Sequence, residues 1–213
     1  MFELLQEVIQ YTQSHLAELW GALGEHLLLV AIALGISMTV CIPLGIWTAR
    51  SKVVSAVVLN TFNTLRVVPS IAVLFLAIPF WGLSFTSAVV ALTLLAFPPV
   101  LVNTDAAYRT IDPAIRESAK GMGMTARQIL WRVETPLALP IIVAGIRNAA
   151  TEVIASATLA AFIGIGGLGL FVVRGFALYD IAILLVGAIP VALLALSAEI
   201  ILEAAQRKLQ PPA

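Results

Sequence analysis

The sequence has few charged residues, and this scarcity excludes most classes of soluble protein. Asp, Glu, Lys and Arg make up 11% of the 213 residues, whereas 61% are hydrophobic, and the mean hydropathy is +1.03. A soluble domain carries about 25% charged residues, and a chain of this size could not bury so much apolar surface. Disordered chains are polar and charged, so disorder is excluded as well. The composition therefore predicts an integral membrane protein with a single domain.

Other absences exclude particular chemistries. Cys41 is the single cysteine, which rules out an internal disulfide framework and a cysteine-rich zinc site. His15 and His26 have no ligand set at metal spacing apart from the neighbouring Glu25, so no metal is expected. The loop pattern G-x-x-x-x-G-K-[ST] does not occur, so this chain cannot hold nucleotide phosphates in the usual way. Twelve basic and twelve acidic residues cancel, which indicates no partnership with nucleic acid.

The apolar runs predict an all-α protein with about five transmembrane helices. A helix that crosses the bilayer needs about 20 mainly apolar residues, and the apolar runs, divided at glycine- and serine-rich breaks, give segments of about that length. The fourth is extended backwards to reach this length and so includes Arg147 and Glu152. The predicted spans are Leu27–Ala49, Thr64–Trp81, Ser87–Thr104, Leu139–Ile163 and Ile181–Ala198. We expect Pro98 and Pro99 to kink the third span, because proline removes a helical hydrogen bond.

The distribution of Lys and Arg predicts the orientation in the membrane. Residues 1–25 contain four glutamates and no Lys or Arg, whereas the loop after the first span, the segment 105–135 and the C-terminus hold nine of the twelve basic residues. Cytoplasmic loops are enriched in Lys and Arg. We therefore expect the N-terminus outside and the C-terminus in the cytoplasm.

The spacing of apolar residues predicts an amphipathic helix over residues 1–25, which would lie on the outer face of the membrane. The alternative is a helix that packs on the protein's own outer loops. Residues 26–205 would then form the transmembrane domain, in contact with the lipid bilayer, and residues 206–213 a short cytoplasmic tail.

The long polar segment 105–136 predicts two short cytoplasmic helices. Asp112 and Pro113 are typical of a helix start, and Gly121-Met122-Gly123 is typical of its end. Thr125 and Gln128 form a capping box that starts a second helix. One face of the first helix is apolar, with Ile111, Ile115, Ala119 and Met122. Such a loop could dock on a partner, and the alternative is a solvated connector.

This segment resembles the cytoplasmic signature of binding-protein-dependent ABC transporter permeases. The family pattern is Glu-Ala-Ala, three residues, Gly, nine residues, Ile-x-Leu-Pro, and Glu117, Ala119, Gly123 and Pro136 match it in register. The resemblance implies the fold of a type I ABC importer permease, similar to the methionine permeases, with coupling helices that bind an ATPase subunit. The implied coupling residues are Asp112, Pro113, Ile115, Arg116, Glu117, Ala119, Lys120, Gly121, Met122, Gly123 and Thr125.

Other stretches are similar to the osmoprotectant branch of this family, which imports glycine betaine, carnitine and choline. They include 68–72, 136–140 and 158–169. The resemblance implies ATPase subunits that hold ATP and Mg²⁺, a second identical or related permease subunit, and an extracytoplasmic substrate-binding protein of a bacterial inner membrane. It implies no cofactor and no enzymatic activity on this chain. The alternatives are a permease for methionine or another amino acid, and a non-transport membrane scaffold.

Charged residues in or near the spans are functional candidates by default. Arg66 could reach the inner interface by snorkelling. Glu152 and Arg147 have imperfect helical spacing for a pair, so we expect Glu152 to find its partner on another helix. Together with Pro69 and Asn103, these three residues either line the translocation path or hold helices together.

The glycines Gly164, Gly166, Gly167 and Gly169 include the spacing of a dinucleotide-binding loop. They follow an apolar helix and not a strand, so this function is not expected. We interpret them as an external turn in contact with the substrate-binding protein.

Overall fold

The computed structural model describes residues 2–210, which form helices and no strand. In chain order the α-helices are α1 (Phe2–Ser14), α2 (Leu16–Thr48), α3 (Lys52–Leu65), α4 (Ser70–Trp81), α5 (Phe85–Arg109), α6 (Pro113–Gly121), α7 (Ala126–Ile129), α8 (Thr135–Ala157), α9 (Gly169–Leu178) and α10 (Ile181–Leu209). A π-helical turn, η1 (Leu130–Glu134), precedes α8, and a 3₁₀ turn, η2 (Thr158–Ile163), follows it.

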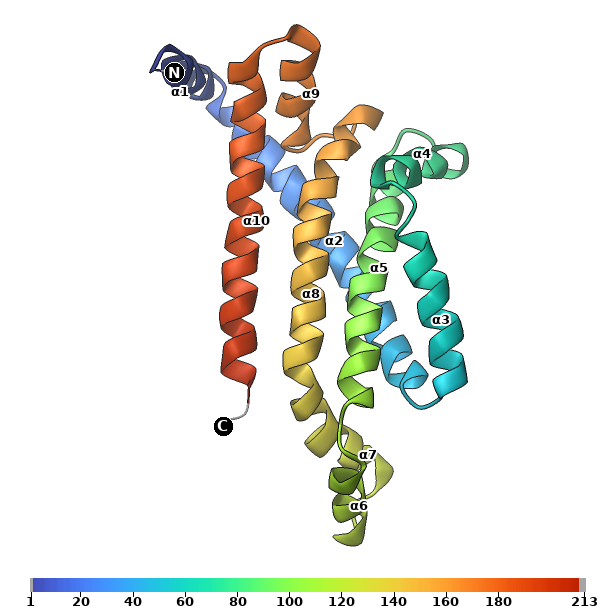
Figure 1. Cartoon of the computed structure of the whole chain (residues 1–213). Helices are drawn as coiled ribbons and strands as arrows, with labels where there is room; N and C mark the ends of the chain where they lie inside the picture. The colour runs from blue at the N-terminus through green and yellow to red at the C-terminus, as the bar shows by residue number, and fades with distance from the viewer. Residues whose placement is uncertain (1, 211–213) are drawn as a thin grey trace.

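Long apolar helices form the body of the molecule (Figure 1). Four are long and apolar enough to cross a membrane: α2, α5, the continuous segment Ala126–Ile163 around α8, and α10. The bent pair α3 and α4 supplies a fifth crossing if it counts as one span. Helix α5 is the most buried and packs against α2 and α8. The all-helical membrane fold predicted from composition is confirmed.

The second span differs from its prediction. In place of a continuous helix over Thr64–Trp81, α3 ends at Leu65, α4 begins at Ser70, and the two are bent by 94°. Helix α4 lies crosswise at the end of the bundle that also carries α9 (Figure 1). Pro69 explains the break, because proline lacks an N–H and disfavours helical geometry at the preceding Val68. The apolar run hides this break, since hydropathy does not report backbone direction.

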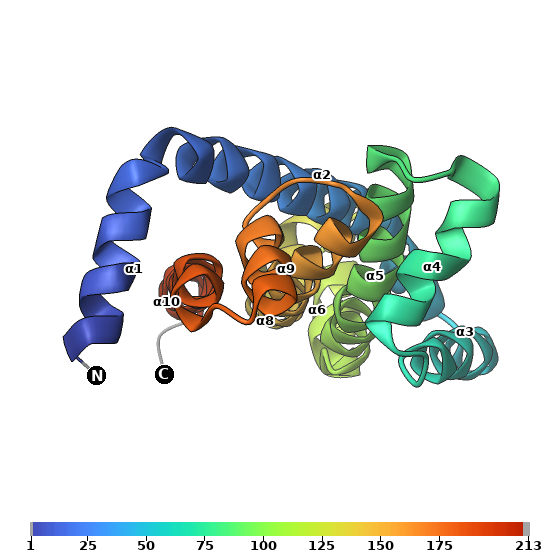
Figure 2. The same ribbon diagram turned by 90° about the horizontal axis from the view of Figure 1, so that it is seen from above.

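The predicted N-terminal helix over residues 1–25 is also divided. Helix α1 ends at Ser14, whose hydroxyl donates to the carbonyl oxygens of Gln10 and Tyr11. Residues from Leu16 onward already belong to the 33-residue helix α2. Helix α1 crosses beside the end of α10 (Figure 2), and its Val8 packs on a buried cluster that includes Leu168. Phe2, Leu5 and Ile9 of the same helix remain exposed.

Close helix contacts occur where glycine removes a side chain. A Cβ atom at Gly45 of α2 would lie 2.6 Å from Cβ of Thr104, and one at Gly145 of α8 would lie 2.6 Å from Cβ of Asn103. Both approaches are to α5, which runs unbroken through Pro98 and Pro99. The core of the molecule is therefore the three-helix contact of α2, α5 and α8.

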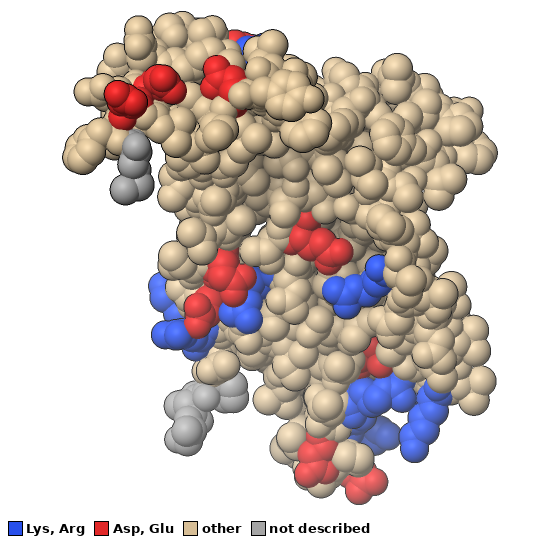
Figure 3. Space-filling model, turned by 45° about the horizontal axis from the view of Figure 1, so that its top comes forward, with Lys and Arg blue, Asp and Glu red and all other residues tan. Residues whose placement is uncertain are grey.

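Basic side chains are distributed unevenly along the molecule. Those visible in Figure 3 gather mostly in the half that carries α6 and α7, whereas acidic side chains occur in both halves and are the main charges around α1. Helix α10 ends on the α6 side and α1 lies at the opposite end (Figure 1). This polarity follows the arrangement of charges along the sequence.

Candidate coupling and translocation sites

Helices α6 and α7 project beyond the bundle, and their boundaries follow local capping chemistry (Figure 1). The Asp112 carboxylate accepts a hydrogen bond from the Ala114 N–H at 2.8 Å, with Pro113 in the first turn. Gly123 adopts φ +78°, and the next residue, Met124, donates its N–H to the Ala119 carbonyl. Thr125 and Gln128 form the predicted capping box. The two predicted helix starts are confirmed, while Gly121 is the last helical residue and Gly123 makes the turn.

The predicted coupling residues divide into an inward and an outward set. Ala119 is buried and Arg116 is half-buried, so these two attach α6 to the rest of the molecule. Ile115 and Met122 are 39% and 74% exposed, although both are apolar. The remaining predicted residues are exposed: Asp112, Pro113, Glu117, Lys120, Gly121, Gly123 and Thr125. The outward set gives α6 a mixed apolar and charged surface that a partner could contact.

A buried carboxylate anchors α6 to the bundle. Glu134 of η1 is 1% exposed and accepts hydrogen bonds from two arginines, Arg50 at 2.6 Å and 3.0 Å and Arg116 at 2.5 Å. Arg116 also donates to the carbonyl oxygen of Tyr108 at the end of α5. These charge-assisted bonds connect the loop after α2, helix α6 and the start of α8. We call this the Arg50–Glu134–Arg116 cluster.

The intramembrane charges pair across helices. The Arg66 guanidinium, directly after α3, lies 3.7 Å from the Glu152 carboxylate of α8, and Arg147 of α8 lies 3.3 Å from Glu199 of α10. The expectation that Glu152 finds its partner on another helix is confirmed. Whether Arg66 also reaches the inner interface by snorkelling stays a prediction. Helix α3 carries Arg66 about 20 Å along the bundle from its start at Lys52, given a rise of about 1.5 Å per residue.

A cavity of about 330 Å³ surrounds the Arg66–Glu152 pair. Its walls come from α4 and α5, with Phe80 and Trp81 on one side and Leu94 and Pro98 on the other. The remaining path candidates lie elsewhere. Pro69 is exposed at the break before α4, and Asn103 donates to the Pro99 carbonyl at 2.8 Å within the close contact of α5 and α8. The position of Asn103 favours helix packing.

Backbone conformation and contacts within the chain explain the glycines of the glycine-rich turn. Gly164 and Gly167 have φ of +76° and +94°. The Gly167 N–H donates to the Glu25 carboxylate at 3.0 Å, and a side chain at Gly166 would collide with that carboxylate. A Cβ at Gly169 would collide with the backbone of Thr158. Contact of this turn with a substrate-binding protein stays a prediction.

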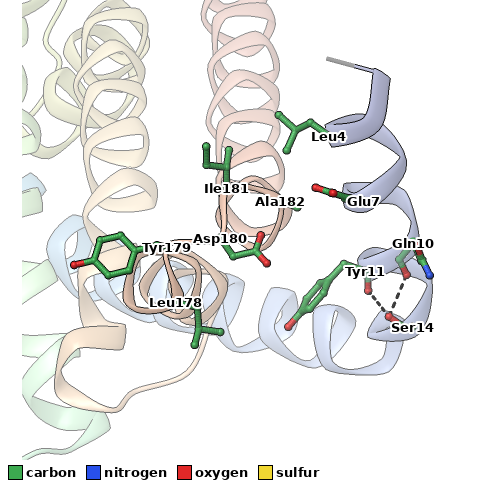
Figure 4. A pocket seen from close by; sticks show the side chains of 10 residues that line it. All are labelled: Leu4, Glu7, Gln10, Tyr11, Ser14, Leu178, Tyr179, Asp180, Ile181 and Ala182. Atoms are coloured by element: carbon green, nitrogen blue, oxygen red, sulfur yellow. Dashed lines mark hydrogen bonds between the residues drawn. The ribbon is translucent and has the colours of Figure 1, made fainter.

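The surface beside α1 contains residues that the sequence did not single out. A cavity of about 630 Å³ lies between α1 and the start of α10, and the carboxylates of Glu7 and Asp180 both reach toward it (Figure 4). Tyr179 points away from it, is 94% exposed and has φ +55°. Its positive φ is unusual for a bulky residue, and no sequence pattern predicts it. An exposed aromatic here adds to the surface that a partner could contact.

Arg174 of α9 links this helix to α1 and α2. Its guanidinium donates to the Glu18 carboxylate at 2.6 Å and 3.2 Å and to the Tyr11 hydroxyl at 3.3 Å. These hydrogen bonds, the one to Glu18 above all, raise the pKa of Arg174, so it stays charged. Within residues 2–210, no group of three or more His, Cys, Asp and Glu side chains could hold a metal ion.

Known proteins of similar sequence are membrane transport components. The chain is 39% identical over 209 residues to the carnitine transport permease protein OpuCB of Listeria monocytogenes, covering 98% of this chain and 96% of that protein. It is 37% identical over 207 residues to the choline transport system permease protein OpuBB of Bacillus subtilis, covering 97% and 95%.

Solved structures and family patterns agree with these relatives. The inward-facing MetNI methionine ABC transporter matches with a TM-score of 0.80 at 21% identity, over 93% of this chain and 99% of the solved one. This likeness confirms the expected fold, that of type I ABC importer permeases. The pattern of the binding-protein-dependent transport system inner membrane component matches residues 41–211. The chain therefore belongs to the family of inner membrane components of binding-protein-dependent transport systems.

Proposed function

We propose that this chain is the permease subunit of an ATP-driven importer for quaternary-amine osmoprotectants, namely glycine betaine, carnitine and choline. The observation that carries the proposal is the near full-length identity of 37% to 39% with permeases named for choline and carnitine. The methionine transporter shares the fold at 21% identity. Fold alone does not select a substrate, so the sequence relatives weigh more.

The arrangement of α6 supports a coupling role. In the proposal, two ATPase subunits, which hold ATP and Mg²⁺, contact the exposed residues of α6 in two permease subunits, identical or related. The Arg50–Glu134–Arg116 cluster connects α6 to α2 and α8. Movement of an ATPase would therefore pass to the spans as a rigid-body shift between inward-facing and outward-facing states. The permease itself performs no covalent chemistry.

The opposite end of the molecule is the proposed docking face for an extracytoplasmic substrate-binding protein. It carries α1, α9 and the exposed Tyr179. Nine of the twelve Lys and Arg residues belong to the segments assigned to the other side. Because basic residues favour the cytoplasmic side, the proposal places the N-terminus outside and the C-terminus in the cytoplasm of the inner membrane.

Uptake by the reconstituted complex tests the proposal. The permease is co-purified with its ATPase and binding protein and placed in vesicles loaded with ATP, with ADP-loaded vesicles as the control. Labelled glycine betaine, carnitine, choline and methionine are offered separately. We expect ATP-dependent uptake of the quaternary amines. Uptake of methionine alone would support the amino-acid alternative, and uptake of none would refute an import function for these substrates.

A further inference from the structure

Within residues 2–210, the Arg66–Glu152 pair is the longest of the ion pairs that link distant segments of the bundle. Its closest N–O distance is 3.7 Å, longer than a hydrogen bond. The pairs of Glu134 with Arg50 and Arg116 and of Glu18 with Arg174 all close to hydrogen-bond distance. Half of the Arg66 side chain and 35% of the Glu152 side chain remain exposed. Both groups therefore keep hydrogen-bonding capacity that the protein does not use.

The surroundings of this pair are apolar and aromatic. Phe80 and Trp81 of α4 line the same cavity, with ring centroids 5.6 Å apart, and they are 77% and 47% exposed. The cavity of about 330 Å³ is of a size that suits a small molecule. Charged side chains at membrane depth ordinarily face a protein interior or a water-filled path. An open ion pair beside exposed aromatic rings is a combination that can accept a charged ligand.

We propose that this cavity is a substrate-binding site within the permease for a small zwitterion that carries a quaternary ammonium and a carboxylate. A quaternary ammonium cannot donate hydrogen bonds, so it is recognised by aromatic faces and a nearby negative charge. Phe80, Trp81 and Glu152 supply these. The ligand carboxylate would accept charge-assisted hydrogen bonds from the Arg66 guanidinium. The ligand ammonium thus replaces Arg66 as the counter-ion of Glu152, and the ligand carboxylate replaces Glu152 as the counter-ion of Arg66. Neither side chain is left as an unpaired charge.

This inference rests on the proposed function, and it adds a selectivity that the relatives do not specify. Glycine betaine and carnitine carry both charges, whereas choline has an ammonium and no carboxylate. Glu152 should therefore serve all three substrates, and Arg66 should serve only the zwitterions. A pair with a purely structural role would show no such difference between substrates.

Binding to the permease–ATPase complex without its binding protein isolates the proposed site. Labelled glycine betaine and choline are titrated onto the purified complex in detergent. We expect saturable binding of both by the unmodified complex. Glu152→Gln should weaken both by about ten-fold or more, and Arg66→Gln should weaken glycine betaine by about ten-fold while leaving choline within two-fold, since ten-fold corresponds to one lost ionic contact of about 1.4 kcal/mol.

Arg207→Gln is the matched control. It removes an exposed arginine of α10 that pairs with Glu203 of the same helix and does not line the cavity, so both ligands should bind as before. If the charge variants fail to assemble, Phe80→Leu takes their place, because this exposed ring contributes little to packing. It should weaken both ligands several-fold. Unchanged binding in that variant would overturn the proposal.

Different results would refute the proposed function and the proposed binding site. If the unmodified complex imports no quaternary amine in vesicles, the proposed function is wrong. If it imports them, but the complex shows no saturable binding or Arg66→Gln affects choline and glycine betaine equally, the binding site is wrong and the function stands. A cavity filled by a lipid chain or by the second permease subunit would produce this second result, with altered assembly and unaltered selectivity.

Discussion

At the residue scale, Glu134 joins the segments that meet at the base of α6. It is 1% exposed and bonded to two arginines. A buried carboxylate is unfavourable unless its lone pairs are satisfied. Arg50 and Arg116 come from different parts of the chain, so satisfying Glu134 requires both segments to be in place. The cluster therefore couples the position of α6 to that of α2 and α8.

Replacing Arg116 with alanine should uncouple the transporter. The substitution leaves Glu134 with Arg50 alone and frees the Tyr108 carbonyl, and we expect it to cost about 1–3 kcal/mol of stability. Thermal unfolding of the purified complex measures this cost. Uptake should fall about ten-fold or more while the complex still hydrolyses ATP, because in the proposed coupling mechanism α6 would no longer pass movement to the spans.

Arg132→Ala controls for the loss of a positive charge. Arg132 is exposed on the same π-helical turn as Glu134, and within residues 2–210 no carboxylate lies within 4.0 Å of it. It should keep normal uptake. If Arg116→Ala also transports normally, the cluster has no role in coupling.

Sequence reasoning identified the charged residues but not their partners. Glu134 occupies the unspecified position in the family signature, so the pattern gives it no weight. The Arg66–Glu152 and Arg147–Glu199 pairs join residues on different helices. Helical spacing reports neighbours within one helix, so it could reject Arg147 as the partner of Glu152 but could not supply Arg66.

At the element scale, the turn between α6 and α7 depends on one glycine. Gly123 has φ +78°, a region that residues with a Cβ adopt at a cost of roughly 1–2 kcal/mol. Gly121, two residues earlier, is helical. A Cβ atom would meet nothing within 4 Å at either position, so backbone conformation is the main difference between them.

Alanine at these two glycines should have opposite effects. Gly123→Ala should strain the turn, misplace α7 relative to α6 and lower the ratio of uptake to ATP hydrolysis. Gly121→Ala should be neutral or slightly stabilising, because alanine is the better helix former by about 1 kcal/mol. Uptake and ATPase rates of the reconstituted complexes provide the ratio. Equal ratios for both variants would contradict a role for the left-handed turn.

The helix ends that could be predicted are those whose signals are local. Asp112-Pro113 and the Thr125–Gln128 capping box act within three residues and were recognisable in the sequence. The division of the N-terminal helix at Ser14 and the break before α4 were missed. Both lie inside continuous apolar periodicity or hydropathy, where composition indicates burial but not the direction of the chain.

At the scale of the whole molecule, the expected orientation can be tested with cysteine chemistry. Cys41 is fully buried, so it should give little background. Glu3 and Lys208 are exposed near opposite ends of the chain. A membrane-impermeant maleimide should label Glu3→Cys in intact spheroplasts, and Lys208→Cys only in inside-out membranes, because basic residues favour the cytoplasmic side. The reverse pattern of labelling would contradict the proposed topology.

The class of integral membrane protein could be predicted because it depends on the amino-acid composition of the whole chain. A composition of 61% hydrophobic and 11% charged residues suffices for a membrane protein. A cavity cannot be predicted from composition in this way. The site beside Arg66 depends on the 94° bend that brings α4 across α5, and composition does not determine that angle.

The same bend bears on how this subunit could sit among its neighbours. Between α3 and α4, the N–H groups of Arg66, Val67 and Val68 make turn hydrogen bonds in place of helical ones. Irregular backbone in hydrocarbon is stable only against protein or water. In the proposed assembly, we therefore expect the flank that carries these residues to face the second permease subunit or the translocation path. Lipid would then contact the other sides of the bundle, and the bend would orient the subunit around the axis of the transporter.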